Sequence, residues 1–90
     1  MMPVTIYTKS WCPYCQDAKA LLTAKHVPFE EISVDGDRAA QGKMAERAGG
    51  RSSVPQIFIG DRHVGGCDDL YALDGAGRLD AMLRGETAGA

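Results

Sequence analysis

The stretch that decides the fold is Lys9-Ser10-Trp11-Cys12-Pro13-Tyr14-Cys15, which joins a short β-branched segment, Val4–Tyr7, to an amphipathic helical pattern. Two cysteines three positions apart both fit the first turn of a helix, close enough to bridge. The free N–H groups and partial positive charge of a helix N-terminus favour a thiolate, the reactive form of cysteine. Pro13 suits the first helical position, because its missing N–H costs nothing there. The pattern predicts a redox site with Cys12 as the outer, attackable sulfur and Cys15 as its partner.

Bulk properties restrict the class of protein. The 90 residues predict a single domain, 1–90, with residues 85–90 a frayed tail. A net charge of −2 without a basic block argues against nucleic-acid binding, and no apolar run is long enough to cross a membrane. The first residues lack the basic-then-apolar pattern of a signal segment. Three cysteines, two of them in one CxxC, fit a reducing compartment, so we expect a cytoplasmic protein.

The first half of the chain reads as strand, helix, strand. Residues 5–8 form the first expected strand, and residues 13–25 the first helix, with small and apolar residues on one face. Pro28 disfavours helical geometry for the residue before it and so closes the helix. Residues 29–34 form the second strand, which completes a right-handed βαβ unit.

The second half predicts a helix, a hairpin and two more helices. Asp37 caps a helix that runs to residue 48 and has only a thin apolar stripe, and Gly49-Gly50 stops it. Strands 56–59 and 63–65 pair around a tight turn. A helix opens at Gly66-Cys67, capped by Asp68 or Asp69, and a short last helix follows. The order predicts an α/β fold with a four-stranded mixed sheet and helices on both faces.

Three blocks of sequence together resemble the glutaredoxin family, over residues 4–83. They are Cys12-Pro13-Tyr14-Cys15, Ser53-Val54-Pro55 and Gly65-Gly66-Cys67-Asp68-Asp69, in this order along the chain. The Cys-Pro-Tyr-Cys form is similar to that of dithiol glutaredoxins and unlike the Cys-Gly-Pro-Cys of thioredoxins. The resemblance implies a thioredoxin fold and an enzyme, a monomeric glutathione-dependent disulfide oxidoreductase. One departure is Ser53, where glutaredoxins commonly have Thr.

The resemblance also implies where glutathione binds. The implied binding residues, besides the catalytic Cys12 and Cys15, are Lys9, Tyr14, Ser53, Val54, Pro55, Gly66, Cys67 and Asp68. In the family the proline of the second block is cis, which would leave the Val54 N–H and C=O facing Cys12. Asp68 would pair with the γ-glutamyl ammonium, and Lys9 would face both the thiolate and the glycine carboxylate. Arg51 is a weaker candidate for that carboxylate.

Several of these residues have simpler interpretations. Cys67 fits a small buried hydrophobic residue as well as a binding residue, and Lys9 fits a solvated strand-end charge. Tyr14 either flanks a bound peptide or is merely exposed. Trp11 either helps to dock substrates or packs half-buried. His26 and His63 are expected at the surface, without a spacing that would complete a four-ligand zinc site, so no metal site is expected.

The implied reaction is the reduction of glutathione mixed disulfides by Cys12 alone and of protein disulfides by Cys12 and Cys15 together. Glutathione is the expected co-substrate, with no tightly bound cofactor, and ribonucleotide reductase is among the compatible protein substrates. Two rival hypotheses remain: a thioredoxin-like reductant served by a flavoprotein, and an iron–sulfur carrier dimer. The Gly66-Cys67-Asp68 segment argues against the first, and Pro13 in the cysteine loop argues against the second.

Overall fold

The computed structural model describes residues 2–85, so the expected frayed tail lies outside the described residues except for Gly85. Its strands are β1 (Val4–Thr8), β2 (Glu30–Ser33), β3 (Gln56–Ile59) and β4 (Arg62–Gly65). Its helices are α1 (Pro13–Ala24), α2 (Arg38–Arg47), α3 (Cys67–Gly75) and α4 (Leu79–Leu83). Every expected element is present, with ends that differ by at most one residue from those expected.

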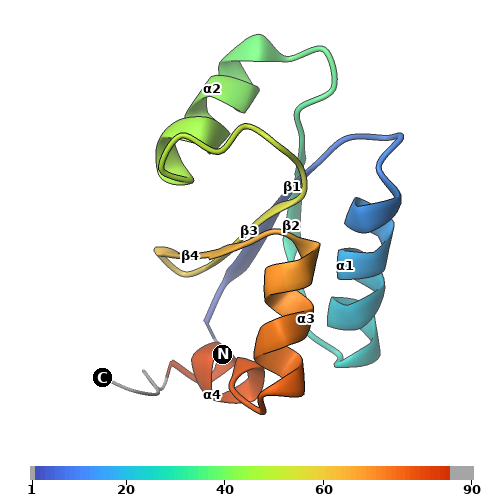
Figure 1. Ribbon diagram of the computed structural model, residues 1–90, viewed down its shortest axis with the longest axis vertical. Coiled ribbons are helices and arrows are strands. Elements are labelled where there is room, and N and C mark those ends of the chain that lie inside the picture. Colours follow the sequence, from blue (N-terminus) through green and yellow to red (C-terminus); the bar gives the residue numbers. More distant parts are fainter. Residues whose placement is uncertain (1, 86–90) are drawn as a thin grey trace.

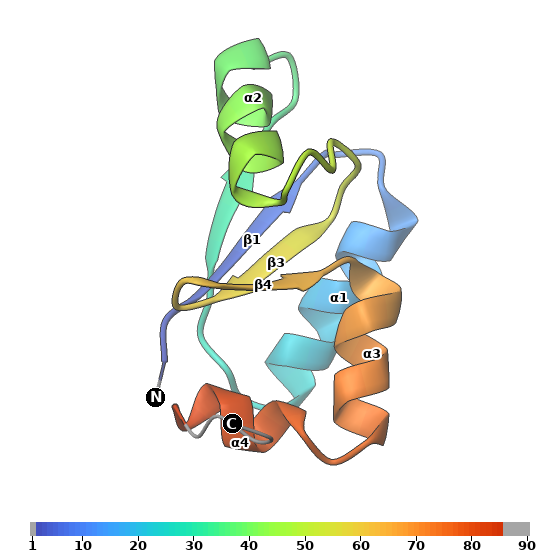
Figure 2. The ribbon, with the colours of Figure 1, turned by 60° about the vertical axis from the view of Figure 1, so that its left-hand side comes forward.

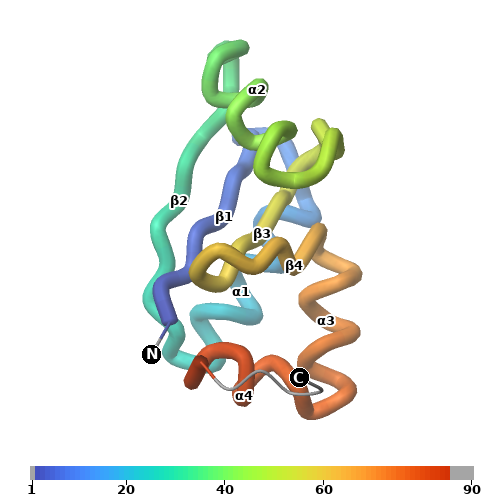
Figure 3. The backbone as a smooth tube through the Cα atoms, turned by 90° about the vertical axis from the view of Figure 1, so that its left-hand side faces the viewer, coloured from blue at the N-terminus to red at the C-terminus, as the bar shows by residue number. Residues whose placement is uncertain are grey.

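The strands form one mixed sheet in the order β2-β1-β3-β4, which Figure 3 shows from left to right. β1 pairs parallel with β2 and antiparallel with β3, and β4 pairs antiparallel with β3. The alternation of side chains along a strand sends successive residues to opposite faces, so each face collects its own core. The predicted mixed sheet is therefore confirmed.

Helices cover both faces of this sheet (Figures 1 and 2). On one face, α1, α3 and α4 enclose the larger core, whose fully buried members include Ile6, Leu22, Ile57, Leu70 and Leu79. On the other face, α2 alone covers a smaller core. That core consists of Tyr7, Val34, Met44, Ala48 and Phe58. The thin apolar stripe expected on α2 is thus enough to bury this smaller face.

Two helix ends differ from the expectation. α1 ends because His26 adopts a left-handed conformation, with φ 58°, and donates its N–H to the Thr23 carbonyl at 3.0 Å. Val27 then donates to the Leu22 carbonyl at 2.9 Å, which completes a Schellman motif without glycine. The N-cap of α3 is Gly66, neither Asp68 nor Asp69. The prediction of an aspartate at the cap was wrong by two or three positions.

The chain ends of the described part meet at the base of the sheet. The Met2 N–H donates to the Leu83 carbonyl at 2.7 Å, so α4 holds the residues before β1 (Figure 2). Lys25 bridges the end of α1 to Asp74 of α3, at 2.7 Å, and to Asp80 of α4, at 3.1 Å. Cys12 and Cys15 lie at the opposite end of the sheet, where β1 runs into α1 and β3 begins. In the described part of the chain, no helix is both long and apolar enough to span a membrane.

Candidate active site

Cys12 is the N-cap residue of α1, directly after the loop that leaves β1. Its backbone is extended (φ −98°, ψ 106°), and its sulfur accepts the N–H of Cys15 at 3.2 Å. Pro13 occupies the first helical position, as predicted. One of the unpaired N–H groups of the first turn therefore points at a half-buried sulfur, an arrangement that stabilises negative charge on it.

Cys15 lies one turn into α1 and is fully buried, with 0% of its surface exposed. Burial, together with its hydrogen bond to Cys12, raises the pKa of Cys15 to about 12. A thiol with so high a pKa is protonated at neutral pH and is a poor first nucleophile. The two cysteines are thus distinguished by their surroundings: the Cys12 sulfur is half-buried at the helix N-terminus, and Cys15 is fully buried one turn into α1.

The segment before β3 closes over Cys12. The Val54–Pro55 peptide bond is cis, and the Val54 carbonyl lies 3.7 Å from the Cys12 sulfur. Within residues 2–85 the Val54 N–H makes no hydrogen bond. The Val54 N–H and C=O therefore form a short backbone edge, next to the Cys12 sulfur, with which an extended peptide can pair.

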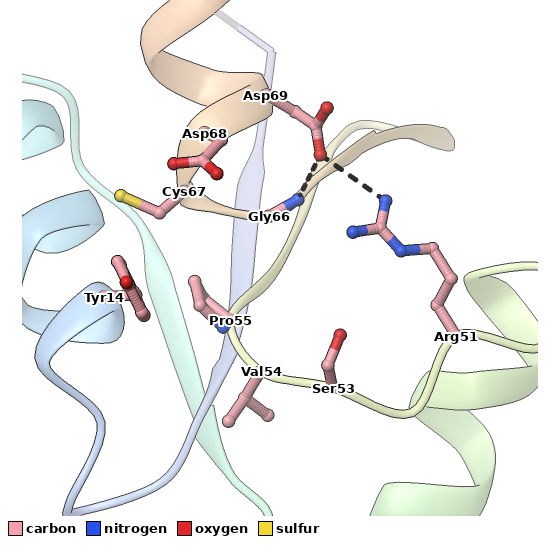
Figure 4. A pocket seen from close by; sticks show the side chains of 9 residues that line it. All are labelled: Tyr14, Arg51, Ser53, Val54, Pro55, Gly66, Cys67, Asp68 and Asp69. Atoms are coloured by element: carbon pink, nitrogen blue, oxygen red, sulfur yellow. Dashed lines mark hydrogen bonds and ion pairs between the residues drawn. The ribbon is translucent and has the colours of Figure 1, made fainter.

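A groove of about 330 Å³ extends from this edge to the N-terminus of α3 (Figure 4). It is lined by residues of α1, of the loop before β3 and of the first turn of α3. These are Tyr14, Arg51, Ser53, Val54, Pro55, Gly66, Cys67, Asp68 and Asp69. All the expected glutathione-binding residues except Lys9 therefore line one groove, although they come from segments some 40 residues apart in the chain.

The two adjacent aspartates of α3 have different surroundings. Asp69 accepts the N–H of Gly66 at 2.8 Å and lies 3.4 Å from Nη1 of Arg51 (dashed lines in Figure 4). The Asp68 carboxylate makes no hydrogen bond or ion pair within residues 2–85. Asp69 is therefore committed to the helix cap, and Asp68 keeps a free carboxylate at the groove. The Asp69 carboxylate thus forms the half of a capping box that returns to the N-cap N–H, while Gly66 has no side chain to form the other half.

Cys67 lies at the other side of the same turn, with 7% of its surface exposed. Cys67 belongs to the larger core and also lines the groove. Burial, with smaller contributions from the Asp17 and Asp68 carboxylates, raises the pKa of the Cys67 thiol. The structure agrees with the simpler interpretation of its side chain, a small buried hydrophobic group.

Lys9 lies at the end of β1, half-buried, and does not line the groove. Beside it, the Ser10 N–H donates to Asp35 at 2.8 Å, and the Ser10 hydroxyl donates to the same carboxylate. These hydrogen bonds, with the charge of Lys9 adding to them, hold the pKa of Asp35 below its ordinary value. Asp35 thus anchors the cysteine loop to the residues after β2, a contact that the sequence did not reveal.

The two aromatic residues of the cysteine loop are both exposed. Trp11 has 89% of its surface exposed, so the half-buried packing role considered for it was wrong. Tyr14 is 61% exposed and lines the groove, so it stands where it could flank a bound peptide. A large apolar side chain held almost entirely in solvent beside Cys12 is available to a partner surface.

His63 is only partly exposed, so the prediction of a surface position holds only in part. It is half-buried in β4, its ring lies against Phe58 with 5.0 Å between centroids, and its Nε2 lies 2.6 Å from Oε1 of Gln56. His26 is exposed, as predicted. Neither histidine contacts Cys12.

Comparison with known proteins agrees with this geometry. The glutaredoxin family model matches residues 4–64. Glutaredoxin 3 of Escherichia coli K12 is 56% identical over 84 residues, covering 93% of this chain and 100% of that protein. A probable glutaredoxin of a Synechocystis species is 59% identical over 80 residues, covering 89% of this chain and 91% of its own.

Solved structures give the same assignment for the fold. The solution structure of a Brucella melitensis glutaredoxin superposes with a TM-score of 0.84 at 51% identity, covering 97% of this chain and 95% of that one. A buckwheat glutaredoxin in complex with glutathione superposes with a TM-score of 0.84 at 30% identity, covering 93% of this chain and 78% of that one. The fold is thus the thioredoxin fold, as the resemblance implied. The chain belongs to the glutaredoxin family of glutathione-dependent thiol–disulfide oxidoreductases.

Proposed function

We propose that Cys12 is the nucleophile of this oxidoreductase and that the groove holds the glutathione part of a mixed disulfide. The observation that carries the proposal is the placement of the Cys12 sulfur. It accepts the Cys15 N–H at 3.2 Å and lies 3.7 Å from the Val54 carbonyl, beside the groove. The Cys15 N–H favours negative charge on this sulfur, and the Val54 carbonyl beside it belongs to a backbone edge that fits a cysteinyl peptide.

In the first step the Cys12 thiolate attacks the glutathione sulfur of a protein–glutathione disulfide. A Cys12–glutathione disulfide forms, the original S–S bond breaks, and the protein sulfur leaves as a thiolate that takes up a proton. In the second step the thiolate of free glutathione attacks the bound glutathione sulfur. Glutathione disulfide leaves and the Cys12 thiolate returns, so one cysteine of the enzyme is enough.

The groove offers complementary groups for the cysteinyl and γ-glutamyl parts of glutathione. The Val54 N–H and C=O fit the cysteinyl backbone, and the free Asp68 carboxylate fits the γ-glutamyl ammonium. The N–H groups at the start of α3 suit the neighbouring γ-glutamyl carboxylate. Tyr14 would flank the bound peptide. For the glycine carboxylate Lys9 remains a proposal, and it would have to reach from outside the groove lining.

Protein disulfides need the second cysteine. Cys12 attacks one sulfur of the substrate, and Cys15 then attacks Cys12 in the mixed disulfide, releasing the reduced protein and leaving a Cys12–Cys15 disulfide for glutathione to reduce. Because burial raises the pKa of Cys15 to about 12, its proton must leave as the attack occurs. We propose cytoplasmic glutathionylated proteins and disulfide enzymes such as ribonucleotide reductase as substrates, with the enzyme acting as a monomer.

Turnover of two substrates by two variants tests the proposal. Cys12→Ser should abolish reduction of both a glutathionylated peptide and a protein disulfide. Cys15→Ser should keep full turnover on the glutathionylated peptide, because the second thiol comes from glutathione, and should fail on the protein disulfide. If Cys15→Ser is as inactive as Cys12→Ser on the peptide, the one-cysteine route is wrong and a dithiol cycle replaces it.

A further inference from the structure

A buried amide connects the groove to the edge strand of the sheet. Gln56 begins β3 and has 0% of its surface exposed. Its Nε2 donates to the Ser53 carbonyl at 3.0 Å and to the Ser53 hydroxyl oxygen at 3.3 Å. On its other side, Oε1 lies 2.6 Å from Nε2 of His63 in β4. We refer to the side chains of His63 and Gln56 with Ser53 as the Gln56 network.

The donor and the acceptor of each hydrogen bond in this network follow from the Ser53 carbonyl at one end of it. A carbonyl oxygen can only accept, so the amide nitrogen of Gln56 faces Ser53 and the amide oxygen faces His63. His63 must therefore carry a hydrogen on Nε2. Burial, with the Arg51 charge adding and the Asp69 charge opposing, lowers the pKa of His63. The neutral ring has a single N–H, and the network assigns it to Nε2.

The same reasoning fixes the role of the Ser53 hydroxyl. Its oxygen accepts an N–H from Gln56, so its own hydrogen remains available to another acceptor. Figure 4 shows this hydroxyl pointing into the groove, in the space between Pro55 and Arg51. Ser53 thus presents a hydrogen-bond donor to whatever lies there, and the complementary ligand group is a carboxylate or carbonyl oxygen.

The His63 ring is itself held in place. His63 and Phe58 are direct cross-strand partners, and their rings lie 5.0 Å apart with an interplanar angle of 31°. The Arg47 guanidinium of α2 lies 4.1 Å from the centroid of the same Phe58 ring and donates to the Tyr7 hydroxyl at 2.9 Å. Packing on the α2 face therefore keeps the His63 Nε2 directed at Gln56.

We propose that Gln56 and His63 are positioning residues, which orient the Ser53 hydroxyl as a donor to a carboxylate or carbonyl oxygen of the glutathione moiety. Neither side chain lines the groove, so both act only through Ser53. The inference rests on the proposed function, because it assumes that glutathione occupies the groove. The further point is that the affinity of the groove for glutathione depends on the N–H of His63 in β4, which lies behind the residues that touch the ligand.

Two substitutions at one position test this inference. His63→Phe keeps a ring against Phe58 but cannot donate to Gln56, whereas His63→Gln keeps an N–H near the position of Nε2. His63→Phe should raise the KM for a glutathionylated peptide about three- to tenfold, the range of one hydrogen bond, with kcat within about twofold. His63→Gln should restore the wild-type KM. If the His63 ring only fills space, His63→Phe should keep the wild-type KM and His63→Gln should raise it.

A double-mutant cycle shows whether the effect passes through Ser53. Ser53→Ala should raise KM, and His63→Phe should add nothing to it in that background. If Ser53→Ala leaves KM unchanged, the assignment of Ser53 to the glutathione groove fails. If Ser53→Ala raises KM but His63→Phe does not, the inference about the Gln56 network alone is overturned.

Nuclear magnetic resonance gives a readout that needs no substrate. A long-range ¹H–¹⁵N spectrum of the wild-type protein should show the neutral Nε2–H tautomer of His63, and Gln56→Met should lose that preference. The Nδ1–H tautomer in the wild-type protein would overturn the hydrogen-bond directions on which the inference is built.

Discussion

Asp68 and Asp69 provide a matched pair for separating binding from stability. Asp69→Ala removes the 2.8 Å hydrogen bond to the Gly66 N–H, which contributes about 1 kcal/mol. It also removes the ion pair with Arg51, but both side chains are about half exposed, 50% and 48%, so this loss is about 0–1 kcal/mol. The higher helix propensity of Ala returns about 0.5 kcal/mol. The net loss of about 1 kcal/mol should lower Tm by about 4–8 °C.

Asp68→Ala should have the reverse effect: it should weaken binding of the substrate and leave the stability almost unchanged. Its carboxylate has no partner among residues 2–85, and the loss of a favourable charge at the helix N-terminus, about 0.3–1 kcal/mol, is offset by the gain in helix propensity. Stability should therefore change by less than about 0.5 kcal/mol. In binding, a lost charge-assisted hydrogen bond of about 1.5–3 kcal/mol should raise the KM for a glutathionylated peptide about 10- to 100-fold.

Thermal unfolding and steady-state kinetics of the two variants, measured side by side, check both statements. The reasoning is refuted if Asp68→Ala destabilises the protein as much as Asp69→Ala while leaving KM unchanged. Asp68 would then be a structural residue of the α3 cap, and the ammonium of glutathione would need another partner.

Two further predictions follow from burial. Iodoacetamide at about pH 7 should label Cys12 and not Cys15, because Cys15 is fully buried and its pKa is raised to about 12; equal labelling of both in the folded protein would contradict the assignment. Burial lowers the pKa of His63, so the folded state favours the neutral ring. Protonation of His63 therefore does not reduce stability above about pH 6.5, and it lowers the free energy of unfolding as the pH falls through the lowered pKa. The free energy of unfolding in urea, measured above and below that pH, should fall in the wild-type protein and fall less in His63→Gln. The same pH dependence in both proteins would exclude His63 as its source.

Local patterns in the sequence were sufficient for the elements, and the family resemblance supplied most of the groove residues. β3 was predicted with its observed bounds, because the apolar residues Ile57–Ile59 lie between turn signals, Pro55 before them and Gly60-Asp61 after them. Asp37 caps α2 as predicted, with its carboxylate accepting the Ala40 N–H at 2.9 Å. The resemblance placed the groove residues because its three motifs lie at the ends of elements that the sheet brings together.

Contacts between distant segments were beyond the sequence. The Ser10–Asp35 pair depends on the docking of β2 beside β1, which no local pattern encodes. The β3–β4 hairpin was predicted, but the Gln56–His63 pair depends on its register, which includes an irregularity between Ile57 and Phe58. Histidine is a residue type of intermediate burial, so the sequence alone predicted His63 at the surface. Its partial burial comes from packing against the Phe58 ring of the facing strand. The end of α1 was attributed to Pro28, whereas the left-handed His26 stops the helix first.

The most direct test of the central claim, that Cys12 alone carries glutathione, is to trap the intermediate. Cys15→Ser, treated with glutathione disulfide, should form a Cys12–glutathione disulfide and release one glutathione, because the resolving thiol is gone. Peptide mapping by mass spectrometry should find the adduct on Cys12 and not on Cys67, whose side chain is buried. An adduct on Cys67, or no adduct at all while the fold is intact, would contradict the account.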